Sequence, residues 1–231
     1  KKTLQLAGAV DKIKVASRDL TNIPLLHAIA ETDSDVIIST GMADKSDLIT
    51  AIGILDRSIT ILHCLSQYPA EYSRLNLMSI KYLEEEFGGE HTIGYSDHSM
   101  GIHIPLAAVA MGAKVIEKHV TLDRNMKGTD HSCSAEPQEM KRMVHDIRTF
   151  ERSLGKRDVF IDDSVKDSSK KLSRSLATYN LLLEGDVIKE EDIHMISPGD
   201  GLKWADLEKV VGRRTNKIIP PNTLISIEDL E

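Results

Sequence analysis

Two histidines in this chain lie where a protein could use them as ligands of one divalent ion. His98 follows the short apolar run 91–95, and His119 follows the run 114–116. Residues just past the carboxyl ends of strands face the ligand in parallel α/β sheets and barrels, and neighbouring strands lie about 4.8 Å apart. If the two runs form adjacent strands, the imidazoles can meet over one ion; otherwise they are ordinary polar residues of the rim or core. A third polar cluster, Asp130-His131, favours the metal interpretation.

Composition and charge exclude several classes of protein. The 231 residues suit one large domain or two unequal ones. The net charge of −7 and the scarcity of aromatic residues argue against nucleic-acid binding, while a local basic pocket for a small anion remains compatible with them. The two cysteines, Cys64 and Cys133, do not make a disulfide framework and predict a reducing, cytoplasmic location. No apolar run approaches the roughly 20 residues that cross a bilayer, so no membrane partner is expected.

The first two-thirds of the chain alternate short β-branched runs with amphipathic stretches. Strands are predicted at 13–16, 36–39, 58–64, 91–95 and 113–118, and helices at 22–31, 44–55, 77–87, 105–112 and 137–154. Five such units indicate a parallel sheet with right-handed crossovers. Eight units would close a barrel and five cannot. An open doubly wound sheet is the alternative, although neither a G-x-G-x-x-G nor a P-loop motif supports nucleotide binding.

The last third of the chain has a different pattern. The polar segment 155–170 is predicted to be an exposed linker between a first domain, 1–154, and a second, 171–231. Short β-like runs at 175–179, 187–188, 194–196 and 224–227 alternate there with turns rich in Gly, Pro and Asp. About 60 residues of short strands predict a small, mostly β domain near the lower size limit for a stable core.

Several short motifs, each weak by itself, occur together along the chain. They are Lys14-Val15-Ala16-Ser17, Ser39-Thr40-Gly41-Met42, His63-Cys64, Tyr68-Pro69, Gly94-Tyr95-Ser96-Asp97-His98, Glu117-Lys118-His119 and Asp130-His131. In this combination and order the chain closely resembles the sialic acid synthase family. The tail, with Arg174-Ser175-Leu176, Pro198-Gly199 and Val211-Gly212, resembles that family's C-terminal antifreeze-like (SAF) domain.

The resemblance implies a (β/α)8 TIM barrel joined to the small SAF domain. Compared with that pattern, the chain begins at the fourth barrel strand and covers about strands 4–8. The three earlier strands carry a catalytic glutamate and a lysine that holds phosphoenolpyruvate in the family. This chain alone is therefore expected to be inactive.

The resemblance also implies an activity, a cofactor and an assembly. Members of the family condense phosphoenolpyruvate with an N-acetylmannosamine-type sugar to give a nonulosonic acid and phosphate. A divalent ion polarises the sugar aldehyde as a Lewis acid. His98 and His119 correspond to its ligands, and an oxygen-rich shell favours Mn²⁺ or Mg²⁺. A domain-swapped homodimer is expected.

Further site residues follow from the resemblance alone. Around phosphoenolpyruvate it places Lys14, Ser17, Ser66 and Ser96, and as catalytic groups that hold the sugar hydroxyls or the aldehyde it places Asp19, Tyr68 and Asp130. Glu117 and Lys118 fit a supporting or ion-pair role. Cys64 fits a small core residue, His63 fits the barrel interior or wall, and Cys133 has no assigned role.

Two departures from the family pattern bear on the ligand. Arg18 replaces a usual Gly and either adds a phosphate contact or blocks a close backbone approach. Ser197 replaces an Arg that contacts the sugar across the dimer in many relatives, which leaves the identity of the sugar open. Two other functions stay open as well: a metal-dependent aldolase or epimerase built on the same barrel, and an inactive binding fragment.

Overall fold

The computed structural model describes residues 10–231, and the chain divides into two compact units between Gly155 and Lys156. The segment 155–170, predicted as a linker, is almost entirely exposed. It is not irregular throughout, because it contains a 3-10 turn at Asp163–Val165 and the start of helix α7, Lys166–Leu172. The predicted domain boundaries at 154 and 170 stay predictions.

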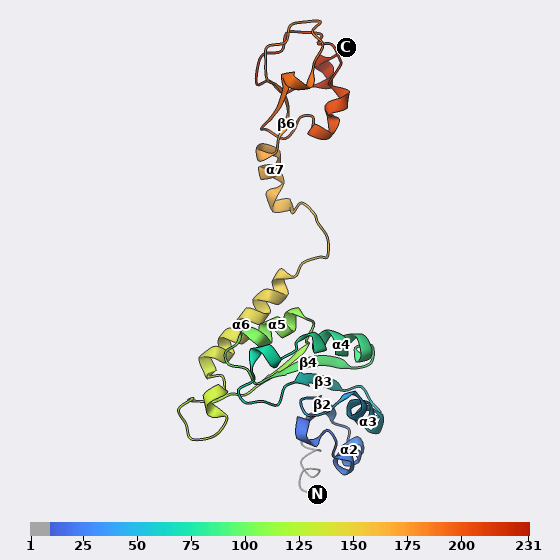
Figure 1. Cartoon of the computed structure of the whole chain (residues 1–231), viewed down its shortest axis with the longest axis vertical. Coiled ribbons are helices and arrows are strands. Elements are labelled where there is room, and N and C mark those ends of the chain that lie inside the picture. The colour runs from blue at the N-terminus through green and yellow to red at the C-terminus, as the bar shows by residue number, and fades with distance from the viewer. Residues whose placement is uncertain (1–9) are drawn as a thin grey trace. The chain divides into compact units, whose positions relative to one another are not determined.

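The first unit is built on one parallel sheet (Figure 1). Its strands are β1 Lys12–Val15, β2 Asp35–Ser39, β3 Thr60–Cys64, β4 Thr92–Asp97 and β5 Val115–Lys118, in the spatial order β1-β2-β3-β4-β5. Every neighbouring pair is parallel. A doubly wound sheet reverses its strand order at a switch point, whereas a barrel adds its strands in one direction. The predicted partial TIM barrel is confirmed, and the doubly wound alternative is wrong.

The helices lie within a few residues of the predicted ranges. They are α2 Ile23–Ala30, α3 Lys45–Leu55, α4 Met78–Phe87, α5 His103–Ala110 and α6 Pro137–Ser153, with 3-10 turns at Ser17–Asp19, Tyr72–Arg74 and His131–Cys133. The Asp44 side chain caps α3 by accepting hydrogen bonds from the amides of Ser46 and Asp47. The Asp47 side chain accepts one from the Asp44 amide in return, which completes a capping box. The fourth strand extends to Asp97, two residues beyond the predicted apolar run, because pairing with β5 continues to that point.

One face of the sheet packs against helices and forms the core. Ile38 of β2, Ile61 of β3, and Ile93 and Tyr95 of β4 are almost completely buried in one cluster with apolar residues of the helices. Side chains alternate between the two faces of a strand. The residues of opposite parity, which include Lys14, Ser39, Ser96 and Glu117, therefore point to the barrel interior.

The second unit has fewer strands than predicted. Strand β6, Ser175–Thr178, pairs antiparallel with β7, Ile193–Ile196, and 3-10 turns cover Glu190–Asp192, Trp204–Lys209 and Ile227–Asp229. The predicted strands 187–188 and 224–227 are wrong and form only isolated bridges. Turns follow them directly, and Pro220-Pro221 next to Asn222, at φ 58°, provides no amide hydrogen for a continuous ladder. Within residues 10–231, no helix combines the length and the apolarity that crossing a membrane would require.

The barrel interior leaves no room for a side chain at Gly94. A Cβ atom on this residue would lie 2.5 Å from the Val115 carbonyl oxygen and 2.5 Å from a methyl carbon of Leu62. Gly94→Ala should therefore lower the free energy of unfolding by about 1–3 kcal/mol through overpacking. Urea unfolding followed by circular dichroism measures the change.

Gly53 in α3 is the matched control, because a Cβ there has no neighbour within 4 Å. Gly53→Ala should raise the free energy of unfolding by about 0.5–1 kcal/mol through helix propensity. Equal stabilities of the two variants would contradict the packing argument.

Candidate active site

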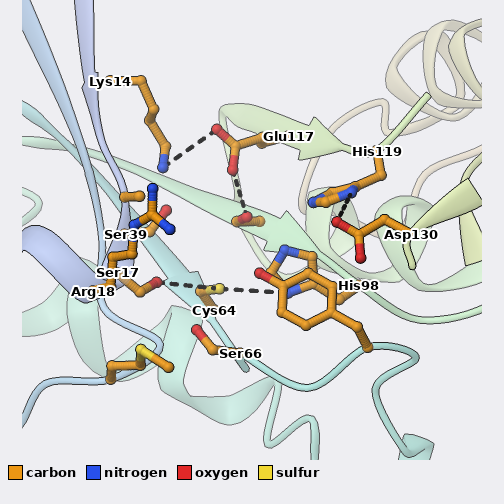
Figure 2. A pocket seen from close by; sticks show the side chains of 14 residues that line it. Lys14, Ser17, Arg18, Ser39, Cys64, Ser66, His98, Glu117, His119 and Asp130 are labelled. Atoms are coloured by element: carbon orange, nitrogen blue, oxygen red, sulfur yellow. Dashed lines mark hydrogen bonds and ion pairs between the residues drawn. The ribbon is translucent and has the colours of Figure 1, made fainter. Parts of the chain in front are cut away.

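A cavity of about 510 Å³ opens where the strands of the parallel sheet end (Figure 2). Its lining residues are Lys14, Ala16, Ser17, Arg18, Ser39, Met42, Cys64, Ser66, Tyr68, Ser96, His98, Glu117, His119 and Asp130. The structure thus brings together all the predicted site residues except Asp19. Asp19 forms an ion pair with Arg18 at 3.6 Å and is not part of the lining.

The two candidate metal-ligating histidines are neighbours. Parallel pairing of β4 with β5 places Asp97 beside Lys118, so the next residues, His98 and His119, leave adjacent strand ends together. Their ring centroids lie 5.1 Å apart in an edge-on arrangement at 84°. The ring of Tyr68 covers both, with its centroid 4.1 Å from that of His98 and 5.4 Å from that of His119.

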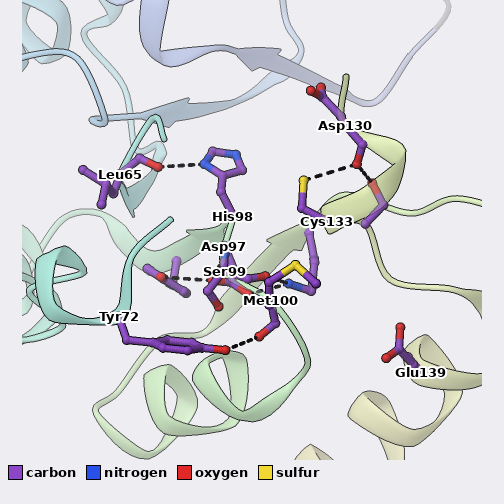
Figure 3. A network of polar contacts seen from close by, with 12 residues as sticks. Leu65, Tyr72, Asp97, His98, Ser99, Met100, Asp130, Cys133 and Glu139 are labelled. Carbon is purple, nitrogen blue, oxygen red and sulfur yellow. Dashed lines mark hydrogen bonds and ion pairs between the residues drawn. The ribbon is translucent and has the colours of Figure 1, made fainter. Parts of the chain in front are cut away.

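The ring of His98 is oriented by a backbone carbonyl. Its Nδ1 lies 2.8 Å from the Leu65 oxygen and 3.8 Å from the Cys64 sulfur (Figure 3). A carbonyl only accepts hydrogen bonds, so the proton is assigned to Nδ1 and the lone pair to Nε2, as in a typical metal-binding imidazole. Burial acts to lower the pKa of His98, but the contacts with Cys64 and the Leu65 carbonyl outweigh it and raise this pKa.

His119 is oriented by the carboxylate of Asp130. Its Nδ1 lies 3.6 Å from Asp130 Oδ2. The backbone oxygen of Asp130 accepts hydrogen bonds from the Ser134 hydroxyl at 2.7 Å and from the Cys133 thiol at 3.2 Å, which anchors the carboxylate-bearing residue. Burial and the positive charge of His98 lower the pKa of His119, while Asp130 opposes that shift.

Lys14 and Arg18 place positive charge on the other side of the cavity (Figure 2). The Lys14 ammonium lies 3.4 Å from Glu117 Oε2, and the hydroxyl of Ser96 donates to Glu117 Oε1 at 2.7 Å. Part of the Lys14 charge is therefore balanced by Glu117. Within residues 10–231, the exposed side chain of Arg18 forms an ion pair only with Asp19, and such surface pairs are weak.

Sequence reasoning missed Ser39 as a site residue. Its side chain is 1% exposed and lines the cavity. Its hydroxyl has no hydrogen-bond partner among residues 10–231, and an unpaired buried polar group is rare and costly. The available signal was its position as the last residue of β2, which is analogous to the polar residues at the ends of the other strands.

Neighbouring small residues make room for a ligand beside Ser39. The Gly41 amide donates to the Ser17 hydroxyl at 3.1 Å. A Cβ on Gly41 would lie 2.5 Å from the Ser66 hydroxyl and 2.8 Å from the Cys64 sulfur. Cys64 is buried, as predicted for a core residue, but its sulfur also faces the cavity and contacts Ser17 and His98.

The donor set at the histidines is compatible with a metal that takes most of its ligands from outside the protein. No group of three His, Cys, Asp or Glu side chains within residues 10–231 is arranged to hold an ion by itself. Two imidazoles with orienting partners supply part of a shell, and the open cavity leaves the remaining positions to water and substrates. The arrangement suits oxygen-preferring ions bound together with a substrate.

Comparison with known protein families gave two matches. A model of the NeuB family matches residues 3–159, and a model of the SAF domain matches residues 182–231.

Individual relatives point in the same direction. The N,N'-diacetyllegionaminic acid synthase of Campylobacter jejuni is 36% identical over 92% of this chain and 65% of its own length. The human N-acetylneuraminate-9-phosphate synthase is 34% identical, over 87% and 57%. A crystal structure of N-acetylneuraminic acid (sialic acid) synthetase from Leptospira borgpetersenii with citrate superposes with a TM-score of 0.63 at 41% identity, over 69% of this chain and 56% of that one. The chain thus spans less than two-thirds of the length of these relatives.

The contact between His119 and Asp130 can be tested by titration. Asp130→Asn removes the carboxylate that favours the imidazolium form, so the pKa of His119 should fall further below its usual value. NMR of the histidine ring protons against pH measures it.

Asp19→Asn is the control for the loss of one negative charge, because Asp19 pairs with Arg18 and not with His119. An equal change in the pKa of His119 in both variants would contradict the assigned contact.

Proposed function

This chain belongs to the NeuB family, and from that premise we propose that the whole protein carrying it is a transferase that joins phosphoenolpyruvate to an N-acetylmannosamine-type sugar. The reaction forms a carbon–carbon bond and yields a nonulosonic acid and inorganic phosphate. One observation carries the proposal: a single cavity has cations and hydroxyls on one side and two oriented imidazoles on the other. Its volume of about 510 Å³ lies in the usual range for small-molecule sites.

The side with Lys14 and Arg18 supports binding of phosphoenolpyruvate. A multiply charged oxyanion requires cations and hydroxyl or amide donors. Lys14 supplies an ammonium, and Glu117 holds it near the cavity at 3.4 Å. Arg18 adds the second cation, because its surface pair with Asp19 is easily exchanged for a phosphate. The hydroxyls of Ser17, Ser39 and Ser66 complete this anion side.

The side with the histidines supports binding of the aldehyde. His98 and His119 would hold Mn²⁺ or Mg²⁺, with water and the substrates as the other ligands, and such an ion supplies Lewis-acid polarisation of the carbonyl. The residues of the chain prepare that arrangement: the Leu65 carbonyl fixes the tautomer of His98, and Asp130 orients His119.

Tyr68 and Asp130 support binding of the sugar. Burial and nearby negative charges raise the pKa of Tyr68, so its hydroxyl stays protonated at neutral pH and can donate a hydrogen bond. The Asp130 carboxylate accepts hydrogen bonds from sugar hydroxyls. Together they would hold the open-chain aldehyde where the enol carbon of phosphoenolpyruvate can attack it.

Ser197 bears on which sugar is used. Its hydroxyl donates to the Leu172 carbonyl at 3.1 Å, so it is engaged within its own unit. We propose a homodimer in which sugar specificity does not depend on an arginine at this position. The two synthases compared above are named for different sugar acids, which is compatible with such variation. Light scattering on the whole protein measures the mass that tests the dimer.

The metal assignment predicts a loss of turnover. In the whole protein, His98→Ala or His119→Ala should lower sugar-dependent phosphate release from phosphoenolpyruvate by at least about 10³-fold, the value of a Lewis-acid contribution of several kcal/mol. Release is measured with and without Mn²⁺ and with and without the sugar.

His27→Ala, on an exposed position of α2, is the control and should keep the wild-type rate. Unchanged rates in either site variant would remove the metal assignment. An aldolase or epimerase on the same barrel would release no phosphate from phosphoenolpyruvate under any of these conditions, and that result would overturn the proposed reaction.

The unpartnered hydroxyl of Ser39 predicts a loss of anion affinity. Ser39→Ala removes a donor to a charged ligand, which is worth about 1.5–3 kcal/mol, so the Kd for phosphoenolpyruvate should rise about 10- to 150-fold. Isothermal titration calorimetry on the chain measures it. Ser153→Ala, at the exposed end of α6, should bind like the wild type, and equal affinities of the two variants would contradict a phosphate contact by Ser39.

A further inference from the structure

A buried ion pair lies beside the cavity without lining it. Lys118 Nζ lies 2.6 Å from Asp97 Oδ2, and the two side chains are 1% and 0% exposed. Both residues have the strand parity of the core residues Ile116 and Tyr95, so they face the helices and not the barrel interior. Neither is among the cavity-lining residues. A direct contact with substrate is therefore not their role.

All the polar groups of this pair have partners. The Lys118 ammonium also donates to the Ser99 carbonyl oxygen at 2.8 Å. Asp97 Oδ1 accepts from the Tyr95 hydroxyl at 3.2 Å and from the Ser99 amide at 3.1 Å. Asp97 and Ser99 flank His98 in the sequence, and Figure 3 shows the three residues close together. The Lys118 ammonium thus binds both sequence neighbours of His98, and Lys118 itself directly precedes His119.

The pair marks the end of the β4–β5 ladder. Asp97 and Lys118 are the last residues of their strands and lie opposite each other in the parallel register. Beyond them, the carbonyl of His98 accepts from the Ala70 amide and that of His119 from the Ala135 amide, both in other loops. The bonds from Lys118 to Asp97 and Ser99 therefore join the two strand ends to each other at the point where the histidines depart.

Stability is a poor explanation for such a pair. Removing two charges from water is costly, and apolar residues of similar volume often replace a buried pair with no loss of stability. Residues that orient metal-ligating side chains without binding the metal themselves typically lower metal affinity or activity by about 10- to 100-fold when they are mutated. The distances and the satisfied hydrogen bonds fit that second role.

We propose that Lys118 is a positioning residue which, through Asp97 and Ser99, fixes the separation and relative orientation of the His98 and His119 imidazoles so that both reach one ion. The inference rests on the metal site of the proposed function. It adds that the geometry of this site is set from the helix-facing side of the sheet.

The test uses the chain itself and the binding of Mn²⁺, with no activity assay. In the wild type, Mn²⁺ should broaden the ring proton signals of His98 and His119 with one common midpoint. In the double variant Asp97→Asn/Lys118→Met, which leaves no unpaired buried charge, the midpoint should move to about 10- to 100-fold higher Mn²⁺. The two rings should also no longer respond together.

Tyr95→Phe provides a milder variant that keeps the test valid if the double variant does not fold. It removes only the hydroxyl that bonds to Asp97 and should raise the midpoint about 2- to 5-fold. Ile29→Ala, a buried core position in α2, controls for destabilisation: it should lower the melting temperature and leave the Mn²⁺ midpoint unchanged.

The outcomes separate this inference from the proposed function. If Mn²⁺ broadens neither ring in the wild type, the metal site fails and the positioning role fails with it. If Mn²⁺ broadens both rings in the wild type, and the folded double variant and Tyr95→Phe keep its midpoint, the metal site stands and the positioning role is overturned. A midpoint that moves equally in Ile29→Ala would also overturn it, because a merely structural role would then account for the change.

Discussion

The parallel register between β4 and β5 is the constraint on which the site depends. It places Asp97 opposite Lys118, so two histidines that are distant in sequence leave the sheet side by side. A slip by one residue would turn every side chain of one strand to the other face, moving Glu117 into the core and Lys118 into the cavity. The apolar cluster that buries Tyr95 and Ile116 therefore protects the site by opposing that slip.

The two sides of the cavity differ in chemistry because different strands end there. The first two strands contribute Lys14 and Ser39 to the anion side, and the last two lead into the histidines, with Glu117 reaching from β5 towards Lys14. Two reactants of different charge can thus be held in one order, with their reacting ends facing each other. Holding reactants in this way would be a large part of the catalysis in the proposed reaction.

The parallel sheet could be predicted from the alternation of apolar runs and amphipathic stretches. The barrel followed only from the resemblance to a family, because an open doubly wound sheet gives the same alternation. The prediction that His98 and His119 meet was conditional on their two strands being neighbours, and the pairing of β4 with β5 meets that condition. The position of Asp19 could not be predicted, because it turns away at a 3-10 turn where pattern reasoning has no period to follow. Ser39 was missed because only the packed structure shows that its hydroxyl is buried and unpaired. In the small unit, β-branched runs at 187–188 and 224–227 were read as strands, but turns that bury Ile188 and Ile225 do not require a ladder.

The absence of a side chain at Gly41 has a consequence for substitutions in this loop. Three short side chains converge on the space that one methyl group would fill, and all three end in polar atoms at the cavity. None of the three is a backbone atom of the sheet. A Cβ at Gly41 would therefore displace side chains that line the cavity and leave the sheet nearly unchanged. In the loop after β2, the shape of the ligand site can thus be varied separately from the stability of the fold.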